Sequence, residues 1–135
     1  MPHKTDSLRM IQFWLMQYIL SIIFAVLLVV AQSSWKHAVG AADTPFKTGF
    51  SLDSVVRFAV SPFVILGMLI YLAAIFLYMY LLSKYEFSFV QSIAIPLSLV
   101  FSMIVATALF GESLSLVNYV GLVVVVFGIV LITTR

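Results

Sequence analysis

Long apolar stretches without charged side chains divide this chain, and they predict its secondary structure. Four windows contain no Asp, Glu, Lys or Arg: residues 10–35, 58–83, 87–111 and 113–134. Each window is 22 to 26 residues long, and a helix needs about 20 apolar residues to cross the ~30 Å core of a bilayer. Because the windows are apolar on every side, they favour helices over the alternating strands of a closed barrel. The pattern therefore predicts an all-α membrane protein with four transmembrane helices.

The predicted helices belong to a single domain over residues 1–135, and they span approximately residues 10–35, 61–83, 88–111 and 114–134. A long loop over residues 36–60 joins the first two helices. Within it, the segment from Asp53 to Phe58 predicts a short interfacial helix capped by Ser51 or Asp53. The pair Ser61-Pro62 is typical of the N-cap and first position of a helix.

Two tryptophans mark the predicted ends of the first helix. Trp14 and Trp35 lie 21 residues apart, or about 31 Å along a helix, which places one at each membrane interface. Four basic residues fall on the side of the N-terminus and three on the other side: Lys4, Arg9, Lys84 and Arg135 against Lys36, Lys47 and Arg57. This small excess predicts a cytoplasmic N-terminus.

Composition excludes several classes of protein. Hydrophobic residues make up 64% of the chain and charged residues 9%, whereas a soluble domain carries about 25% charged residues. A soluble enzyme and a nucleic-acid binder with a basic face are thereby excluded. The chain has no cysteine and only two histidines, so we expect neither a metal site nor a cofactor. No P-loop or hydrolase motif occurs, and every acidic residue lies in a terminus or a turn; we therefore expect that the protein is not an enzyme.

The end of the first predicted helix carries the most distinctive polar cluster, which consists of Gln32, Ser33 and Lys36. A lysine at this position extends its ammonium group to the lipid headgroups. If Lys36 faces inward, it instead provides a contact for an anion such as a phosphate. No other basic residue adjoins a polar cluster at the end of a span, because Arg57 has only apolar neighbours on its membrane side.

Polar residues inside the other spans allow two interpretations. Ala94, Ser98, Ser102 and Ala106 recur every four residues and form one stripe, which fits close helix packing or, alternatively, a narrow polar wall along a substrate path. Gln91 lies near the start of the same helix. Tyr71 and Tyr78 lie seven residues apart on one face of the preceding helix, and they serve either as packing and interface anchors or as an aromatic wall against a ligand.

The last predicted helix contains two glycines, Gly121 and Gly128, on one side. Glycine lets another helix approach closely. We therefore expect this face to form a helix–helix contact, and specifically a dimer interface.

Several of these features resemble the drug/metabolite transporter superfamily. The region from Tyr80 to Ile132 is similar to the second half of an EamA-like domain, through Pro96, the run Leu109-Phe110-Gly111-Glu112 and the two late glycines. Four helices in this length also resemble the small multidrug resistance proteins, in which such a glycine pair forms the dimer contact. The long first loop and Ala31-Gln32 resemble the small paired subunits proposed to flip aminoarabinose–undecaprenyl phosphate.

The resemblance implies a transporter or flippase of an amphipathic, lipid-linked anionic substrate, such as a polyprenyl-phosphate-linked one. Its implied partners are the bilayer and either a second copy or a paired four-helix subunit, in the bacterial inner membrane. Drug exporters of the small multidrug resistance type carry a glutamate eight residues before a lysine, and matching that lysine to Lys36 places Leu28 at the glutamate position. Two alternatives stay open: an exporter of hydrophobic cations, and a non-transporting partner subunit of a membrane enzyme complex.

Overall fold

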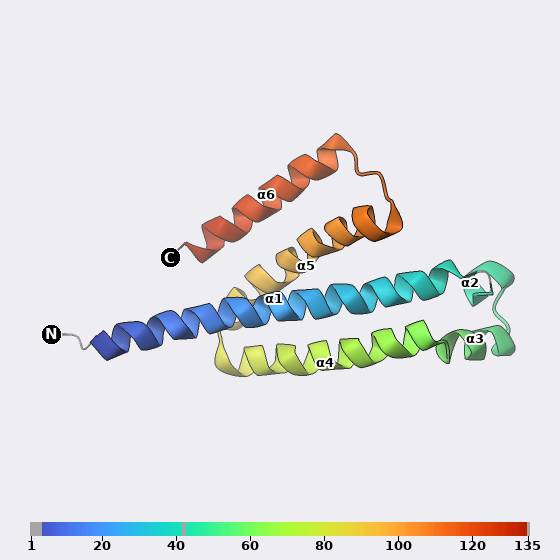
Figure 1. Cartoon of the computed structure of the whole chain (residues 1–135), viewed down its shortest axis with the longest axis horizontal. Helices are drawn as coiled ribbons and strands as arrows, with labels where there is room; N and C mark the ends of the chain where they lie inside the picture. The colour runs from blue at the N-terminus through green and yellow to red at the C-terminus, as the bar shows by residue number, and fades with distance from the viewer. Residues whose placement is uncertain (1–3, 42, 135) are drawn as a thin grey trace.

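The structure is a computed structural model that describes residues 4–41 and 43–134, and its regular elements over those residues are all helices (Figure 1). They are α1 (Lys4–Gly40), α2 (Pro45–Thr48), α3 (Leu52–Ala59), α4 (Pro62–Lys84), α5 (Phe87–Phe110) and α6 (Leu116–Thr133). Helices α1, α4, α5 and α6 are long and apolar enough to cross a membrane. The predicted fold class, an all-α membrane protein with four spanning helices, is confirmed.

Helix α1 is longer than the sequence pattern predicts. It contains 37 residues, or about 55 Å at 1.5 Å per residue, against a hydrocarbon core of about 30 Å. The predicted range of 10–35 is too short at both ends because charged and polar residues end an apolar pattern without ending a helix. Lys36, expected at the start of the loop, consequently lies in the last turns of α1.

The connections follow their local capping signals. Ser51 caps α3, and its side chain accepts a hydrogen bond from the backbone N–H of Ser54 at 3.2 Å. Ser61 caps α4 with Pro62 at its first position, as the sequence predicts. Gly111 ends α5 in the left-handed conformation, at a φ of 61°, which glycine adopts without strain. Helix α2 lies within the long loop that the sequence predicts between the first two spans.

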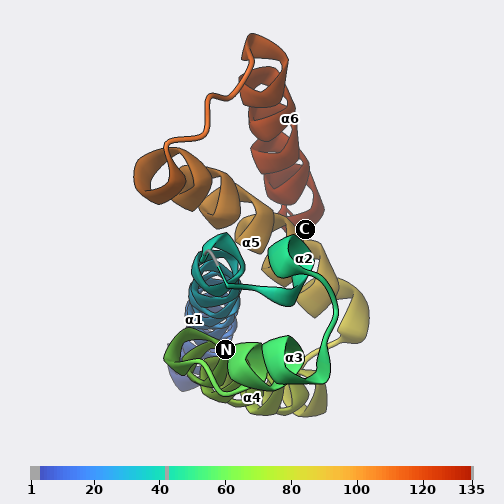
Figure 2. The same ribbon diagram turned by 90° about the vertical axis from the view of Figure 1, so that its right-hand side faces the viewer.

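The four long helices pack unequally. α1 and α4 lie side by side, α5 crosses next to α1, and α6 is outermost and packs chiefly on α5 (Figures 1 and 2). A core cluster joins α1, α4 and α5 through Phe24, Ala74, Leu81, Val90 and Ala94. α6 contributes no buried residue. The chain therefore holds three helices firmly together and leaves most of the fourth uncovered.

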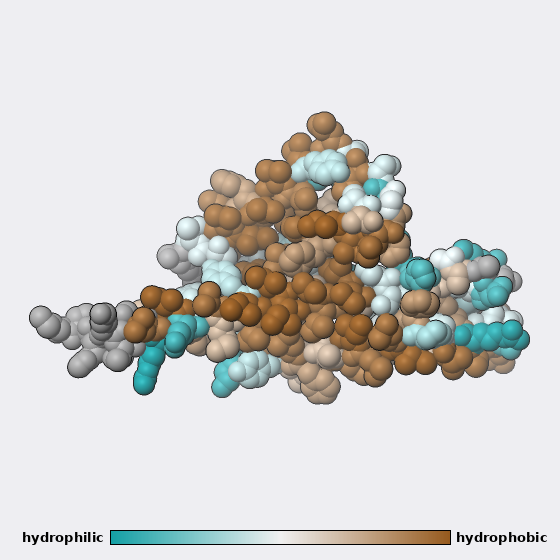
Figure 3. Space-filling model, in the orientation of Figure 1, coloured by the Kyte–Doolittle hydropathy of each residue, from teal (hydrophilic) through white to brown (hydrophobic). Residues whose placement is uncertain are grey.

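The two tryptophans lie at opposite ends of the bundle. Trp14 packs edge-on against Phe89 near the start of α5, with ring centroids 5.3 Å apart. Trp35 donates a hydrogen bond from its Nε1 to the carbonyl of Val64 near the start of α4, at 3.4 Å. Figure 3 shows an apolar middle with hydrophilic side chains gathered toward the ends. Arg135, which the sequence counts with the N-terminal side, lies outside the described residues.

The closest approach of α1 to α4 occurs at Gly67. A Cβ atom added there would overlap the indole of Trp35 and lie 3.0 Å from the carbonyl oxygen of Ala31. Glycine at this position therefore lets the two helices touch through their backbones. The sequence analysis did not single out Gly67.

We predict that Gly67→Ala lowers the free energy of unfolding by about 1–3 kcal/mol, because the added methyl group forces Trp35 or the α1 backbone to move. Gly40→Ala is the matched control, since nothing lies within 4 Å of a Cβ added at that position. Denaturant unfolding in detergent, followed by far-ultraviolet circular dichroism, measures both. Equal stabilities of the two variants would contradict a tight contact at Gly67.

Candidate functional site

A cleft of about 330 Å³ opens between the C-terminal part of α1, the C-terminal half of α5 and the turn that follows α5. Its polar lining residues are Gln32, Ser33, Lys36, Ser102 and Glu112. Apolar side chains, among them Val29, Ala106 and Phe110, complete the wall. Four of the residues predicted from the sequence therefore meet in one cavity: Gln32, Ser33, Lys36 and Ser102.

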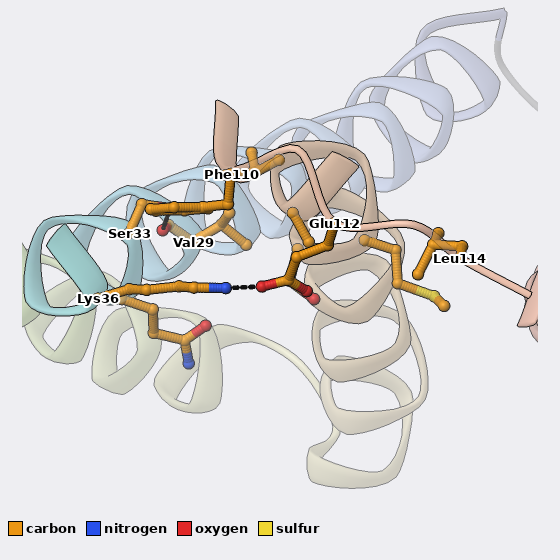
Figure 4. A pocket seen from close by; sticks show the side chains of 11 residues that line it. Val29, Ser33, Lys36, Phe110, Glu112 and Leu114 are labelled. Carbon is orange, nitrogen blue, oxygen red and sulfur yellow. Dashed lines mark hydrogen bonds and ion pairs between the residues drawn. The ribbon is translucent and has the colours of Figure 1, made fainter. Parts of the chain in front are cut away.

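Lys36 is the charged centre of this cleft. Its ammonium group forms an ion pair with the Oε1 atom of Glu112 (Figure 4). The same nitrogen lies over the ring of Phe110, 4.4 Å from the ring centroid, in an arrangement that favours a cation. These contacts tie α1 to the end of α5 and to the α5–α6 turn, and they hold the half-exposed lysine side chain at the cleft.

The remaining polar groups of the cleft differ in their freedom to bind a ligand. Ser33 donates to the carbonyl of Val29 at 2.7 Å, and Ser102 donates to the carbonyl of Leu99 at 2.8 Å. Each hydroxyl group thus keeps its oxygen lone pairs as acceptors. The side chain of Gln32 forms no hydrogen bond within the part of the chain that the structure describes, so it offers both a donor and an acceptor to a ligand.

Four other predicted site residues lie outside the cleft. Tyr71 packs against Trp35, with ring centroids 5.2 Å apart. Tyr78 stacks on Phe24 and donates a hydrogen bond to Oε1 of Gln91 at 2.9 Å. These contacts favour the packing interpretation of the tyrosine face over an aromatic wall.

Ser98 lies one turn of α5 before Ser102, and its hydroxyl group donates to the carbonyl of Ile95 at 2.7 Å. It does not line the cleft. The stripe predicted along α5 is therefore divided, with Ala94 in the core cluster and Ser102 and Ala106 at the cleft.

The predicted dimer face on α6 is open. Nothing lies within 4 Å of a Cβ built at Gly121 or Gly128. The α5–α6 contact thus leaves both glycines unused, and the predicted self-association stays a prediction.

Sequence reasoning missed Glu112 and Phe110 as site residues. Glu112 had been placed in a turn without a partner. A signal for it does exist, because α1 and α5 both end on the same side of the membrane and Glu112 directly follows the end of α5. Its carboxylate is therefore placed near the end of α1, where Lys36 lies.

No family model matches the chain, and neither a curated protein nor a solved structure matches it. Among the described residues, no group of three or more His, Cys, Asp or Glu side chains could hold a metal ion. The chemistry available in the cleft is therefore that of an ion pair, an amide and two hydroxyl groups.

We predict that the ion pair contributes only about 0.5–1 kcal/mol to stability, because the side chains of Lys36 and Glu112 are each 47% exposed. A double-mutant cycle with Lys36→Ala and Glu112→Ala measures this coupling in detergent. Raising the salt concentration from about 0.05 to 0.5 M should reduce it, because exposed charges are screened. A coupling that is absent at low salt would show that the two side chains do not pair.

Proposed function

We propose that this protein transports or flips an amphipathic, lipid-linked anionic substrate across the membrane. The observation that carries the proposal is the position of Lys36, which lines a polar cleft at the end of the helix bundle and pairs there with Glu112. A lipid anchor leaves its tail in the bilayer, so only the headgroup needs a polar path and no wide pore is required. The four-helix arrangement and the resemblance to the drug/metabolite transporter superfamily support the same proposal.

The ammonium group of Lys36 in the cleft supports an anionic substrate. Glu112 already forms an ion pair with Lys36, yet this pair is weak because both side chains are half exposed. A phosphate carries up to two charges and three acceptor oxygens, so it competes effectively with one carboxylate for the same ammonium group. Gln32 and the acceptor oxygens of Ser33 and Ser102 line the same cavity and can hydrogen-bond to the polar part of a headgroup.

The apolar residue at position 28, Leu28, favours an anionic substrate over a hydrophobic cation. In drug exporters of the small multidrug resistance type, the matching position holds the glutamate that exchanges a proton for the cation. Here the side chain at this position is apolar and packs against the core cluster of α1, α4 and α5. The position therefore offers no carboxylate for proton-coupled exchange.

A second four-helix unit completes the proposed transporter, either as a homodimer or as a paired subunit. α6 buries none of its residues within this chain and presents Gly121 and Gly128 without neighbours. Such a face is suited to close contact with another helix. We place the protein in the bacterial inner membrane with a cytoplasmic N-terminus, as the distribution of basic residues favours.

We predict that Lys36→Ala weakens binding of a polyprenyl phosphate about tenfold, because a charge-assisted hydrogen bond of roughly 1.5 kcal/mol is lost. Lys36→Arg retains most of the affinity, since the charge survives. Glu112→Gln should strengthen binding, because it removes the competing carboxylate. Titration of the lipid against protein purified in nanodiscs measures all three.

The three variants together separate a binding site from a simple membrane anchor. If Lys36 only anchors α1 at the interface, the alanine variant changes the depth of the helix and leaves affinity intact. Equal affinities of the wild type, Lys36→Ala and Glu112→Gln would contradict the proposed function.

We predict that Gly128→Leu reduces association between subunits, because the larger side chain blocks close approach of a second helix. Crosslinking and native mass measurement in mild detergent give the dimer fraction. Val123→Phe is a matched control, because it also adds four carbon atoms to α6, at an exposed position away from the glycine face. An unchanged dimer fraction in Gly128→Leu would remove this glycine face from the interface.

A further inference from the structure

A second and larger cavity adjoins the first. It has a volume of about 630 Å³ and lies among the C-terminal end of α1, the segment that contains α2 and α3, and the start of α4. Lys36 and Phe110 line both cavities. The two cavities therefore share a wall that contains Lys36, the side chain that the proposed function assigns to the phosphate.

The second cavity brings together basic side chains that are distant in sequence. Its lining includes Lys36, His37 and Arg57, with Asp43 as an acidic residue. Arg57 had been expected to have only apolar neighbours on its membrane side. That expectation is wrong, because α3 packs against α2 and α4, and Arg57 lines one cavity together with Lys36 and the hydroxyl-bearing Ser61.

Arg57 is available to an incoming anion. Its Nη2 atom lies 2.9 Å from Oδ2 of Asp53, one turn earlier on the same helix. The two side chains are 74% and 73% exposed, so water and salt weaken the pair strongly. A guanidinium group also matches the geometry of phosphate better than an ammonium group does.

Helix α3 is suited to the headgroup region of a bilayer. Leu52 and Val56 are exposed apolar residues of this helix, whereas Asp53 and Arg57 form a charged face. A short amphipathic helix of this kind lies in the plane of the interface. In that orientation the charged face of α3, with Arg57, would lie at the depth of the lipid phosphates.

We propose that the second cavity is an entry site for the phosphate group of the substrate, at which Arg57 binds the anion before it reaches Lys36. This inference rests on the proposed function and extends it by naming Arg57 as a second residue that binds the phosphate of a lipid in the leaflet at this end of the bundle. Thr44 and Ser61 line the cavity alongside the cations and can contribute hydroxyl oxygens to the solvation of the bound headgroup. His37 lies against Phe63, with ring centroids 4.5 Å apart, and forms part of the wall.

The entry site is tested by titrating farnesyl phosphate against the full chain in phosphatidylcholine nanodiscs and measuring its affinity. Arg57→Gln should weaken binding about three- to fivefold, as expected for an exposed charge. Arg57→Lys should recover most of that loss. Asp53→Asn should strengthen binding up to about threefold, because it frees Arg57.

The two substitutions are predicted to change the affinity in opposite directions. This distinguishes a role of Arg57 in binding from a role of the ion pair in stabilising α3. If the ion pair serves only to stabilise α3, Arg57→Gln and Asp53→Asn act in the same direction, and the inference is overturned. If neither variant changes the affinity while Lys36→Ala still weakens it, the proposed entry site at Arg57 is rejected and the proposed function stands. If Lys36→Ala is also without effect, the proposed function fails with it.

A parallel titration with inorganic phosphate separates the two sources of the anion. We expect farnesyl phosphate to bind at least tenfold more tightly, because its tail remains in the lipid. Equal affinities, with the same dependence on Arg57, would assign the cavity to free phosphate and overturn the lipid-linked substrate.

Discussion

The exclusion of charge from the four spans governs where this protein can recognise a polar molecule. Inside lipid, helices associate through packing and small residues rather than through ion pairs, and here the spans carry no charged side chain between their ends. Within the described ranges, the only ion pair that joins two different elements is that of Lys36 with Glu112. It lies at the end of the bundle, where α1, α5 and the α5–α6 turn meet. A weak ion pair at a membrane interface is well suited to exchange, because an incoming anion can replace the carboxylate at small cost.

Packing along the bundle is uneven next to this ion pair. α1 and α4 touch through their backbones at Gly67, and the core cluster joins them to α5. α6 lies outside this unit and buries none of its residues. The Lys36–Glu112 contact therefore connects the firmly packed helices to the turn that leads into the loosely packed one. Under the proposed function, an anion that takes Lys36 from Glu112 would release this connection.

The sequence predicts the elements of this fold better than it predicts their contacts. Charge-free windows located the four spans, and Ser51 and Ser61 act as the helix caps that their positions indicate. Those signals are local, because capping and apolar length depend on neighbouring residues. The extension of α1 to Gly40 was missed because polar residues do not stop a helix. The same limit applies to the site. Gln32, Ser33, Lys36 and Ser102 were chosen by residue type, and they line one cleft. Glu112 joins this cleft, and Arg57 the neighbouring cavity, only through the tertiary arrangement, which no local pattern encodes.

The central claim is that the polar end of the bundle recognises the charge of a lipid headgroup. Native mass spectrometry of the protein with equimolar farnesyl phosphate and farnesol tests this claim most directly, because the two lipids share one tail and differ in the phosphate alone. The account predicts that the phosphate lipid remains bound and that the neutral alcohol is lost at the same collision energy. Equal retention of both lipids would show that the tail alone determines binding, and it would contradict the account.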